Sequence, residues 1–306
     1  MAERTRINER NVVVCDDFDD FAQEVRRPAG TLRLFRGQSN VNWQLSSPFE
    51  RLIWNKSGGS ALAALLLDLK SSDNNFYNQR ILEVFRDAIT GVPGIDTSKL
   101  TDHDLLAIGR HHGLVTPLLD WTESPFIAVF FSCFDLINNL VPGFKSGVCD
   151  SITGPPAVSI HESANYISVW ELKRDDRLEE LRPEFEIIYS RIDQSHRQKA
   201  QRGCFTYLKS NDHLELECYL TSKGLGHALT QYWIPECEAI TALYNLNLMN
   251  IRYASLFPDI EGAAVHANTN WITRLDGSTE RQMYYLTKLL LGSLEPEQGH
   301  TNHESE

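Results

Sequence analysis

A carboxylate between large apolar side chains is the first residue in this sequence whose position calls for a chemical explanation. Asp120 stands between Leu119 and Trp121, shortly before an apolar run that begins at Phe126. Such a segment is expected to be buried, and a buried carboxylate needs hydrogen-bond donors or a nearby cation. The sequence therefore predicts either a binding or catalytic carboxylate, or a structural lock in which backbone groups satisfy Asp120.

An arginine followed by a glycine ends an expected strand much earlier in the chain. Arg36 and Gly37 follow the alternating residues 31–35. A guanidinium at a strand end can bind a phosphate or carboxylate through two parallel hydrogen bonds, and a glycine lets a ligand approach the backbone. The alternative is a structural ion pair, for which Asp120 is a candidate partner.

Two adjacent histidines precede Gly113, where a helix is expected to end. Neighbouring residues on a helix point about 100° apart, so His111 and His112 cannot both bind one metal from a regular helix. One of them can face a cleft while the other is packed or solvated. The charged form of either is favoured by the carboxyl end of the helix.

Further polar or aromatic residues stand where expected elements begin. Trp121 offers a wall for a planar ring, and Thr122 precedes a helix whose start can gather donors for an anion. Gln201 enters an expected strand, and its amide can orient a sugar hydroxyl because it both donates and accepts. Glu236 and Glu238 lie at the start of another helix, where helix capping is the alternative role.

The hydrophobic periodicity predicts the scaffold that must position these residues. Expected strands are 12–14, 31–35, 118–121, 166–172, 204–208, 214–220 and 229–234. Expected helices are 18–25, 48–54, 60–69, 75–89, 102–111, 126–137, the segment after Pro235, 256–267 and 282–291, with the charged segment 177–201 helical in parts. Residues 141–154 are expected to form an exposed insertion. The pattern predicts one α+β domain over residues 31–292, with a strand and helix extension at 1–30 and a disordered polar tail at 293–306.

Composition narrows the class of protein. The 306 residues are 42% hydrophobic and 23% charged, which is typical of a soluble globular protein. No run of 18 apolar residues and no signal peptide are visible, so a cytoplasmic location and no contact with membranes are expected. Six scattered cysteines form no C-x-x-C pair and are expected to be free thiols, and no metal site is expected. A net charge of −12 argues against broad binding of phosphate backbones, although residues 191–202 form a dense basic segment.

Four ordered motifs in this sequence resemble those of the FRG domain family. They are Leu34–Gln38 with Trp43, Leu45, Pro48 and Arg51 after it; His111–Thr122 with Ser124, Pro125, Ala128 and Phe131; Gln201–Phe205; and Leu256–Gly262. Three positions depart from the family pattern, because Arg110, Val115 and Pro117 replace the usual Gln, Pro and Arg. The last of these departures removes a possible phosphate ligand.

The resemblance implies a fold and an activity. The layout of the family is similar to that of ADP-ribosyltransferases, which implies a split β-sheet core with helical decoration. It also implies an NAD-dependent mono-ADP-ribosyltransferase of the FRG type, with NAD as the substrate. By this resemblance Arg36, with Gly37 and Gln38 beside it, would hold the pyrophosphate or the nicotinamide ribose. Trp121 or Thr122 would contact the nicotinamide.

The resemblance leaves the remaining catalytic roles open. Gln201, Glu236 or Glu238 would contact the ribose hydroxyl or the target nucleophile. Asp120 and His111 would support the site by orienting the arginine or by accepting a proton.

The biological setting implied by the family is a bacterial toxin or an anti-phage defence effector. Its target would be RNA, DNA or a protein, and an antitoxin is a possible partner. The basic segment 191–202 favours a nucleic-acid target. Two other functions fit the same residues: a non-catalytic module that senses a nucleotide, and a nuclease or other hydrolase that uses the histidines and Asp120.

Overall fold

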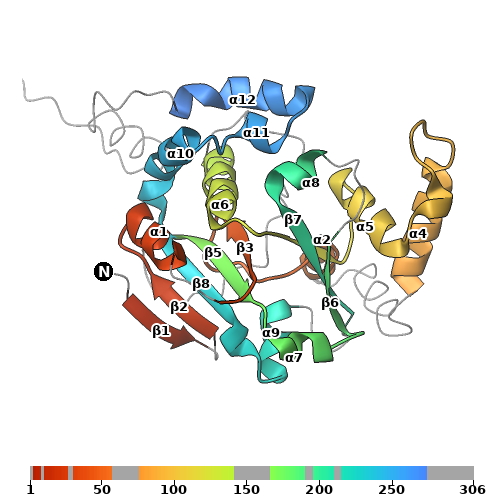
Figure 1. The fold of residues 1–306 in the computed structure, drawn as a ribbon, viewed down its shortest axis with the longest axis horizontal. Coiled ribbons are helices and arrows are strands. Elements are labelled where there is room, and N and C mark those ends of the chain that lie inside the picture. Colours follow the sequence, from red (N-terminus) through yellow and green to blue (C-terminus); the bar gives the residue numbers. More distant parts are fainter. Residues whose placement is uncertain are drawn as a thin grey trace, which may run out of the picture.

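A single sheet of eight strands organises the part of the chain that the computed structural model describes, which is residues 3–7, 10–26, 30–56, 76–140, 166–189, 196–209 and 215–273. The predictions for 60–69, 141–154, 282–291 and 293–306 lie outside these ranges. With its helices on the faces and ends of the sheet, the structure confirms the α+β class (Figure 1).

The strand order differs strongly from the order in the sequence. The strands are β1 (Glu3–Ile7), β2 (Arg10–Val14), β3 (Arg33–Gln38), β4 (Leu118–Thr122), β5 (Tyr166–Lys173), β6 (Phe185–Ile188), β7 (Gly203–Leu208) and β8 (Leu229–Pro235). They lie in the order β1-β2-β8-β5-β3-β4-β7-β6. Only β2 and β8 run parallel, so the sheet is mostly antiparallel.

β3 and β4, the neighbouring strands at the junction of the sheet, share little backbone pairing. β3 pairs with β5 along the whole of Arg33–Gln38, and β4 pairs with β7 along the whole of Leu118–Thr122. By contrast, β3 and β4 are paired at one position only, Phe35 with Thr122. Five strands on one side and three on the other are therefore connected through a single residue pair, and the two strands separate beyond it.

Helices cover the faces and ends of the sheet. They are α1 (Phe18–Arg26), α2 (Pro48–Lys56), α4 (Phe76–Ile89), α5 (Asp102–His111), α6 (Pro125–Leu140), α7 (Asp176–Glu180), α8 (His196–Gln201), α9 (Leu216–Ser222), α10 (Ala239–Leu248), α11 (Tyr253–Leu256) and α12 (Ile260–Thr273). α5 begins with a capping box, in which the Thr101 side chain accepts from the Asp104 N–H and the Asp104 carboxylate accepts from the Thr101 N–H.

Separate apolar clusters pack against the two faces. One cluster joins α1, α6 and α10 to β3, β5 and β8, with Phe21, Phe35 and Val169 among its buried members. On the opposite face a second cluster includes Leu34 and Trp170 and also reaches β4 and β7. A third cluster packs α4 and α5 onto β4, β6 and β7. The second cluster crosses the weak middle of the sheet and so holds its two parts together.

The predicted strand at 214–220 is wrong, because this segment forms α9 from Leu216 to Ser222. Its alternation of leucine and glutamate imitates a half-buried strand. In the structure Glu217 is also buried, and its carboxylate accepts from the Leu45 backbone N–H at 2.9 Å. Two short strands, β1 and β6, were not expected from the sequence. Both lie at the edges of the sheet and pair with one neighbour each.

Candidate functional site

Arg36 lies where β3 and β4 separate. Its Nη1 donates to the backbone oxygen of Asp120 at 2.9 Å and lies 3.6 Å from the Asp120 Oδ2. The side chain of Arg36 is only 13% exposed, so these contacts fix the guanidinium beside β4 rather than in bulk solvent. The structural pairing with Asp120 that the sequence left open is therefore present.

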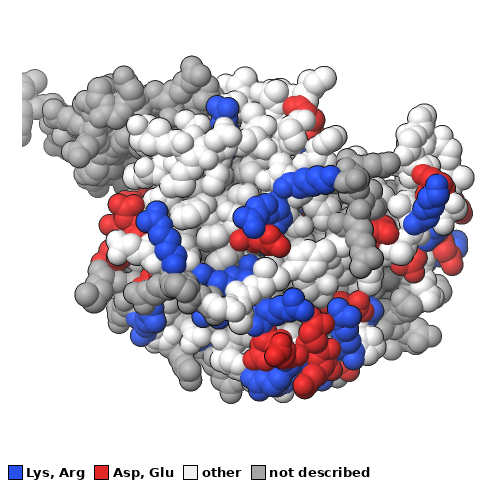
Figure 2. Space-filling model, viewed as in Figure 1, with Lys and Arg blue, Asp and Glu red and all other residues white. Residues whose placement is uncertain are grey.

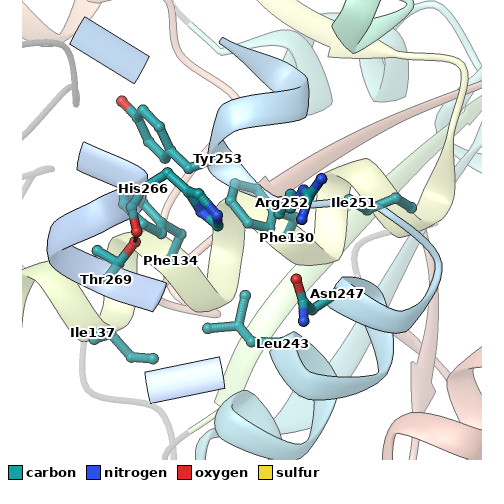
Figure 3. Close-up of a pocket in the computed structure, with 10 residues that line it drawn as sticks. All are labelled: Phe130, Phe134, Ile137, Leu243, Asn247, Ile251, Arg252, Tyr253, His266 and Thr269. Carbon is teal, nitrogen blue, oxygen red and sulfur yellow. Dashed lines mark hydrogen bonds between the residues drawn. The ribbon is translucent and has the colours of Figure 1, made fainter. Parts of the chain in front are cut away.

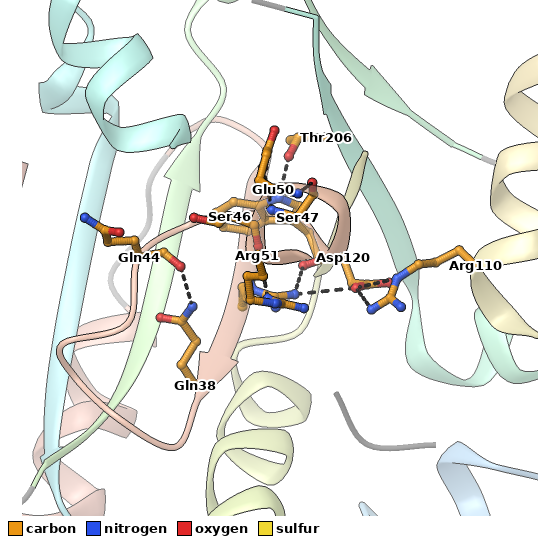
Figure 4. A network of polar contacts seen from close by, with 11 residues as sticks. Gln38, Gln44, Ser46, Ser47, Glu50, Arg51, Arg110, Asp120 and Thr206 are labelled. Carbon is orange, nitrogen blue, oxygen red and sulfur yellow. Dashed lines mark hydrogen bonds and ion pairs between the residues drawn. The ribbon is translucent and has the colours of Figure 1, made fainter. Parts of the chain in front are cut away.

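A second arginine binds the same carboxylate. Arg110, in the last turn of α5, donates to Asp120 Oδ2 through Nε at 3.2 Å and through Nη2 at 2.8 Å (Figure 4). Burial opposes the charged form of Asp120, but the charges of Arg110 and Arg36 prevail and lower its pKa to about 2. Asp120 is therefore ionised at physiological pH. Its side chain is nevertheless 38% exposed, so the carboxylate remains open to a ligand.

The two histidines have different surroundings, as their spacing predicts. His112 is exposed, whereas His111 is half-buried, with its ring 6.0 Å from that of Phe205. Burial lowers the pKa of His111 more than the Asp120 charge and a hydrogen bond with Gln198 raise it. His111 is therefore neutral at pH 7 and can accept a proton.

Gly37 and Gln38 both have structural roles, one in packing and one in hydrogen bonding within the protein. A Cβ on Gly37 would lie 1.9 Å from the Ala128 backbone oxygen, so the glycine allows α6 to pack directly on β3. The Gln38 amide accepts from Trp170 Nε1 at 2.8 Å and donates to the Gln44 backbone oxygen at 3.1 Å. Gln38 is 4% exposed and, in this structure, is bound to the protein itself.

Trp121 and Thr122 lie next to the arginine site but in different surroundings. Trp121 is 3% exposed within the second apolar cluster and donates through Nε1 to Thr206 at 2.9 Å, so its ring offers no open face here. Thr122 donates through its hydroxyl to the Gln201 backbone oxygen at 2.6 Å and accepts from the Ser124 N–H at 3.1 Å. This contact brings the Gln201 motif beside the end of β4.

The three acid or amide candidates are not equally close to the arginine site. The Gln201 side chain donates to the Leu256 backbone oxygen at 3.2 Å, which joins two of the sequence motifs. Glu238, at the start of α10, accepts a hydrogen bond at 3.5 Å from the Phe18 N–H at the start of α1. Burial raises the pKa of both Glu236 and Glu238. Of the predicted residues, the structure brings Arg36, Asp120 and His111 together, with Thr122 and Gln201 alongside.

Three neighbours of the site were not selected from the sequence. Arg110 departs from the family pattern, and its place beside His111 in the last turn of α5 is the sequence signal that points to it. Gln198 is 8% exposed and contacts His111. Arg51, on α2, is 8% exposed and donates through Nη1 to the Ser46 backbone oxygen at 3.0 Å (Figure 4).

The basic segment at α8 is largely engaged with acidic side chains. Arg197 contacts Asp259 at 2.5 Å and Glu261 at 2.8 Å, and Arg202 contacts Glu123 at 3.0 Å. On the face of the molecule in Figure 2, basic and acidic side chains are interspersed. The described part of this segment therefore offers less net positive charge than its sequence suggests.

A small cavity lies away from these residues, between α6, α10, α11 and α12 (Figure 3). Its volume is about 20 Å³, and Phe130, Phe134, Tyr253 and His266 are among its lining residues. This volume is close to that of one water molecule, so it cannot hold a nucleotide. Within the described ranges, no group of three or more His, Cys, Asp or Glu side chains is placed to hold a metal ion, and no helix is long and apolar enough to cross a membrane.

The fold and the site define an α+β protein with two arginines bound to one carboxylate at the junction of its sheet. Residues 32–138, which carry this whole arrangement, match the family model described as the FRG domain. The resemblance predicted from the first two motifs is thereby confirmed. No curated protein and no solved structure matches the chain.

Proposed function

We propose that this protein is an NAD-dependent mono-ADP-ribosyltransferase of the FRG type. The observation that carries the proposal is the cluster of Arg36, Asp120 and Arg110 at the point where β3 and β4 separate. Because Asp120 holds both guanidinium groups, a phosphate or carboxylate group could bind them without first ordering their side chains. The single pair between β3 and β4 is also in keeping with the split core expected for this class.

The proposed ADP-ribosyl transfer requires little covalent chemistry from the protein itself. In ADP-ribosyl transfer the bond from the ribose C1′ to nicotinamide breaks, and the electron pair leaves with nicotinamide. Positive charge then develops on the ribose, and an acceptor nucleophile forms the new bond and loses a proton. The ionised and partly exposed carboxylate of Asp120 can stabilise that positive charge, and neutral His111 can take the proton. Gln201 would orient the acceptor from the adjoining motif.

The biological role that accompanies this activity is that of a cytoplasmic toxin or anti-phage defence effector, for which an antitoxin is a candidate partner. Its target is a nucleic acid or a protein. The ion pairs of Arg197 and Arg202 reduce the electrostatic advantage of a nucleic-acid target.

The proposal is tested by incubating the full chain with adenine-labelled NAD and with separate protein and nucleic-acid extracts. We expect nicotinamide release and label transfer, both reduced about 100-fold or more in Arg36→Ala. Arg80→Ala is the matched control, because Arg80 is an exposed α4 residue that contacts only Glu83 at 3.1 Å among the described residues. Denaturant midpoints establish that both variants fold. Absence of both nicotinamide release and label transfer with the wild-type chain would refute the activity.

A second candidate is a non-catalytic module that binds a nucleotide as a signal. It is favoured by the structural contacts of the Gln201 and Glu238 side chains, which occupy two of the groups expected to act on the ribose or acceptor. Calorimetry separates the two candidates, because saturable NAD binding without nicotinamide release supports the sensor.

A further inference from the structure

Two rows of side chains on one face of the sheet are polar where a buried core is normally apolar. Across the strands the rows are Gln38–Ser168–Trp233 and Arg36–Trp170–Gln231, from β3, β5 and β8 respectively. Paired residues of antiparallel strands point to the same face, and positions two apart along a strand do so as well. These six residues therefore share one face and are called here the polar floor.

Three atoms of the Ser, Gln and Trp side chains of the polar floor have no hydrogen-bond partner among the described residues. They are Ser168 Oγ, Gln231 Oε1 and Trp233 Nε1, and all three atoms are buried. Ser168 and Gln231 are each 0% exposed. Buried polar atoms are normally satisfied, so a hydroxyl, an acceptor and a donor on adjoining positions indicate that something else binds them.

The segment Ser39–Ser47 covers the polar floor. The Val41 backbone oxygen accepts from Gln231 Nε2 at 2.8 Å, and its N–H donates to the Tyr166 oxygen at 3.1 Å. Farther along, the Gln44 oxygen accepts from Gln38 at 3.1 Å, and the Leu45 N–H donates to Glu217. The cover is thus attached to the sheet and to α9 through polar contacts, which a competing polar ligand can replace.

We propose that the polar floor is a subsite for the planar carboxamide group of a nucleotide-type ligand, with Ser39–Ser47 as its cover. The carboxamide N–H donates to Gln231 Oε1, and its oxygen accepts from Trp233 Nε1 and the Ser168 hydroxyl. Arg36 lies two strands from Gln231, about 10 Å away. The subsite therefore fits a ligand whose anionic group and carboxamide are separated by about that distance. The choice of nicotinamide as the carrier of the amide rests on the proposed function.

The test uses nicotinamide alone, added to the isotopically labelled full chain while the indole N–H signals are followed by NMR. Trp233→Phe identifies the signal of Trp233. We expect that signal to shift saturably with nicotinamide, and not with nicotinic acid, whose carboxylate cannot donate to Gln231. Ser168→Ala is expected to weaken nicotinamide binding about 3- to 10-fold, through the loss of one hydrogen bond.

The matched control is Thr230→Val. Thr230 is also buried with an unpartnered hydroxyl, but it pairs with Glu171 and so faces the opposite side of the sheet. Thr230→Val should therefore leave nicotinamide binding unchanged. The proposal is overturned if nicotinamide up to its solubility limit causes no saturable shift, if nicotinic acid acts equally, or if Ser168→Ala binds as Thr230→Val does. In those cases the floor holds only water. NAD turnover is measured separately, so a nicotinamide shift without turnover would retain the subsite and reject the transferase.

Discussion

Replacement of Gly37 by alanine should destabilise the protein strongly, because the packing of β3 against α6 leaves no room for a methyl group. The new Cβ would lie 1.9 Å from the Ala128 oxygen and 2.9 Å from the Ser132 nitrogen. Both are backbone atoms of α6 and cannot rotate away. Ordinary contacts of a Cβ begin near 3.4 Å, so α6 or β3 must move by about 1.5 Å.

The expected magnitude follows from the size of that displacement. Overpacking of a core by one or more methylene groups typically costs about 1–3 kcal/mol. Because the clash at Gly37 is with backbone, we expect the free energy of unfolding to fall by about 3 kcal/mol or more. Urea denaturation followed by circular dichroism measures this loss.

Gly203 supplies the matched control, since it is also a strand glycine beside the candidate site. A Cβ at Gly203 would meet Gln198 Cγ at 3.4 Å, which is an ordinary contact with a movable side chain. Gly203→Ala should change the unfolding free energy by less than about 1 kcal/mol. Equal stability of the two variants would refute the explanation of Gly37 by helix packing.

Two further predictions concern pH and use the same denaturation assay. The pKa of Asp120 is lowered to about 2, so its ion pairs stabilise the fold above the ordinary aspartate pKa of about 3.9, and that stability is lost as pH falls towards 2. Asp120→Asn should therefore flatten the decline in stability over that acid range, and an unchanged decline would count against the ion pairs. Burial raises the pKa of Glu217 to about 7, so its contribution is fully present below about pH 4.3 and is lost as pH rises through 7. Glu217→Gln should remove this loss, and an identical pH profile for variant and wild type would contradict the assignment.

The sequence predicts much of the local structure and part of the site. Asp120 between apolar neighbours required a partner, and Arg36 at a strand end was a candidate, because buried charges are paired. The alternation of β4 also places Trp121 on the face opposite Asp120, which explains why the tryptophan ring is in the core. That consequence can be derived from strand periodicity alone, whereas the expectation that Trp121 forms a wall considered only its aromatic ring and not the face of the strand that it occupies.

The remaining features depend on contacts between distant segments. Arg110 reaches Asp120 because α5 ends beside β4, and no spacing in the sequence specifies that approach. The single pair of Phe35 and Thr122 likewise depends on where two strands diverge in space. The buried Glu217 satisfies its carboxylate at Leu45, so the strand-like alternation around it was a misleading guide.

The position of β8 between β2 and β5 determines when the sheet can be completed during synthesis of the chain (Figure 1). During synthesis β2 emerges long before its inner neighbour β8, because more than 200 residues separate the two strands in the sequence. The ribosome must therefore deliver the residues up to Pro235 before β2 can pair with β8. Until then β2 and β5 each expose an edge of unpaired backbone N–H and C=O groups, so we expect nascent chains stopped before Leu229 to bind chaperones.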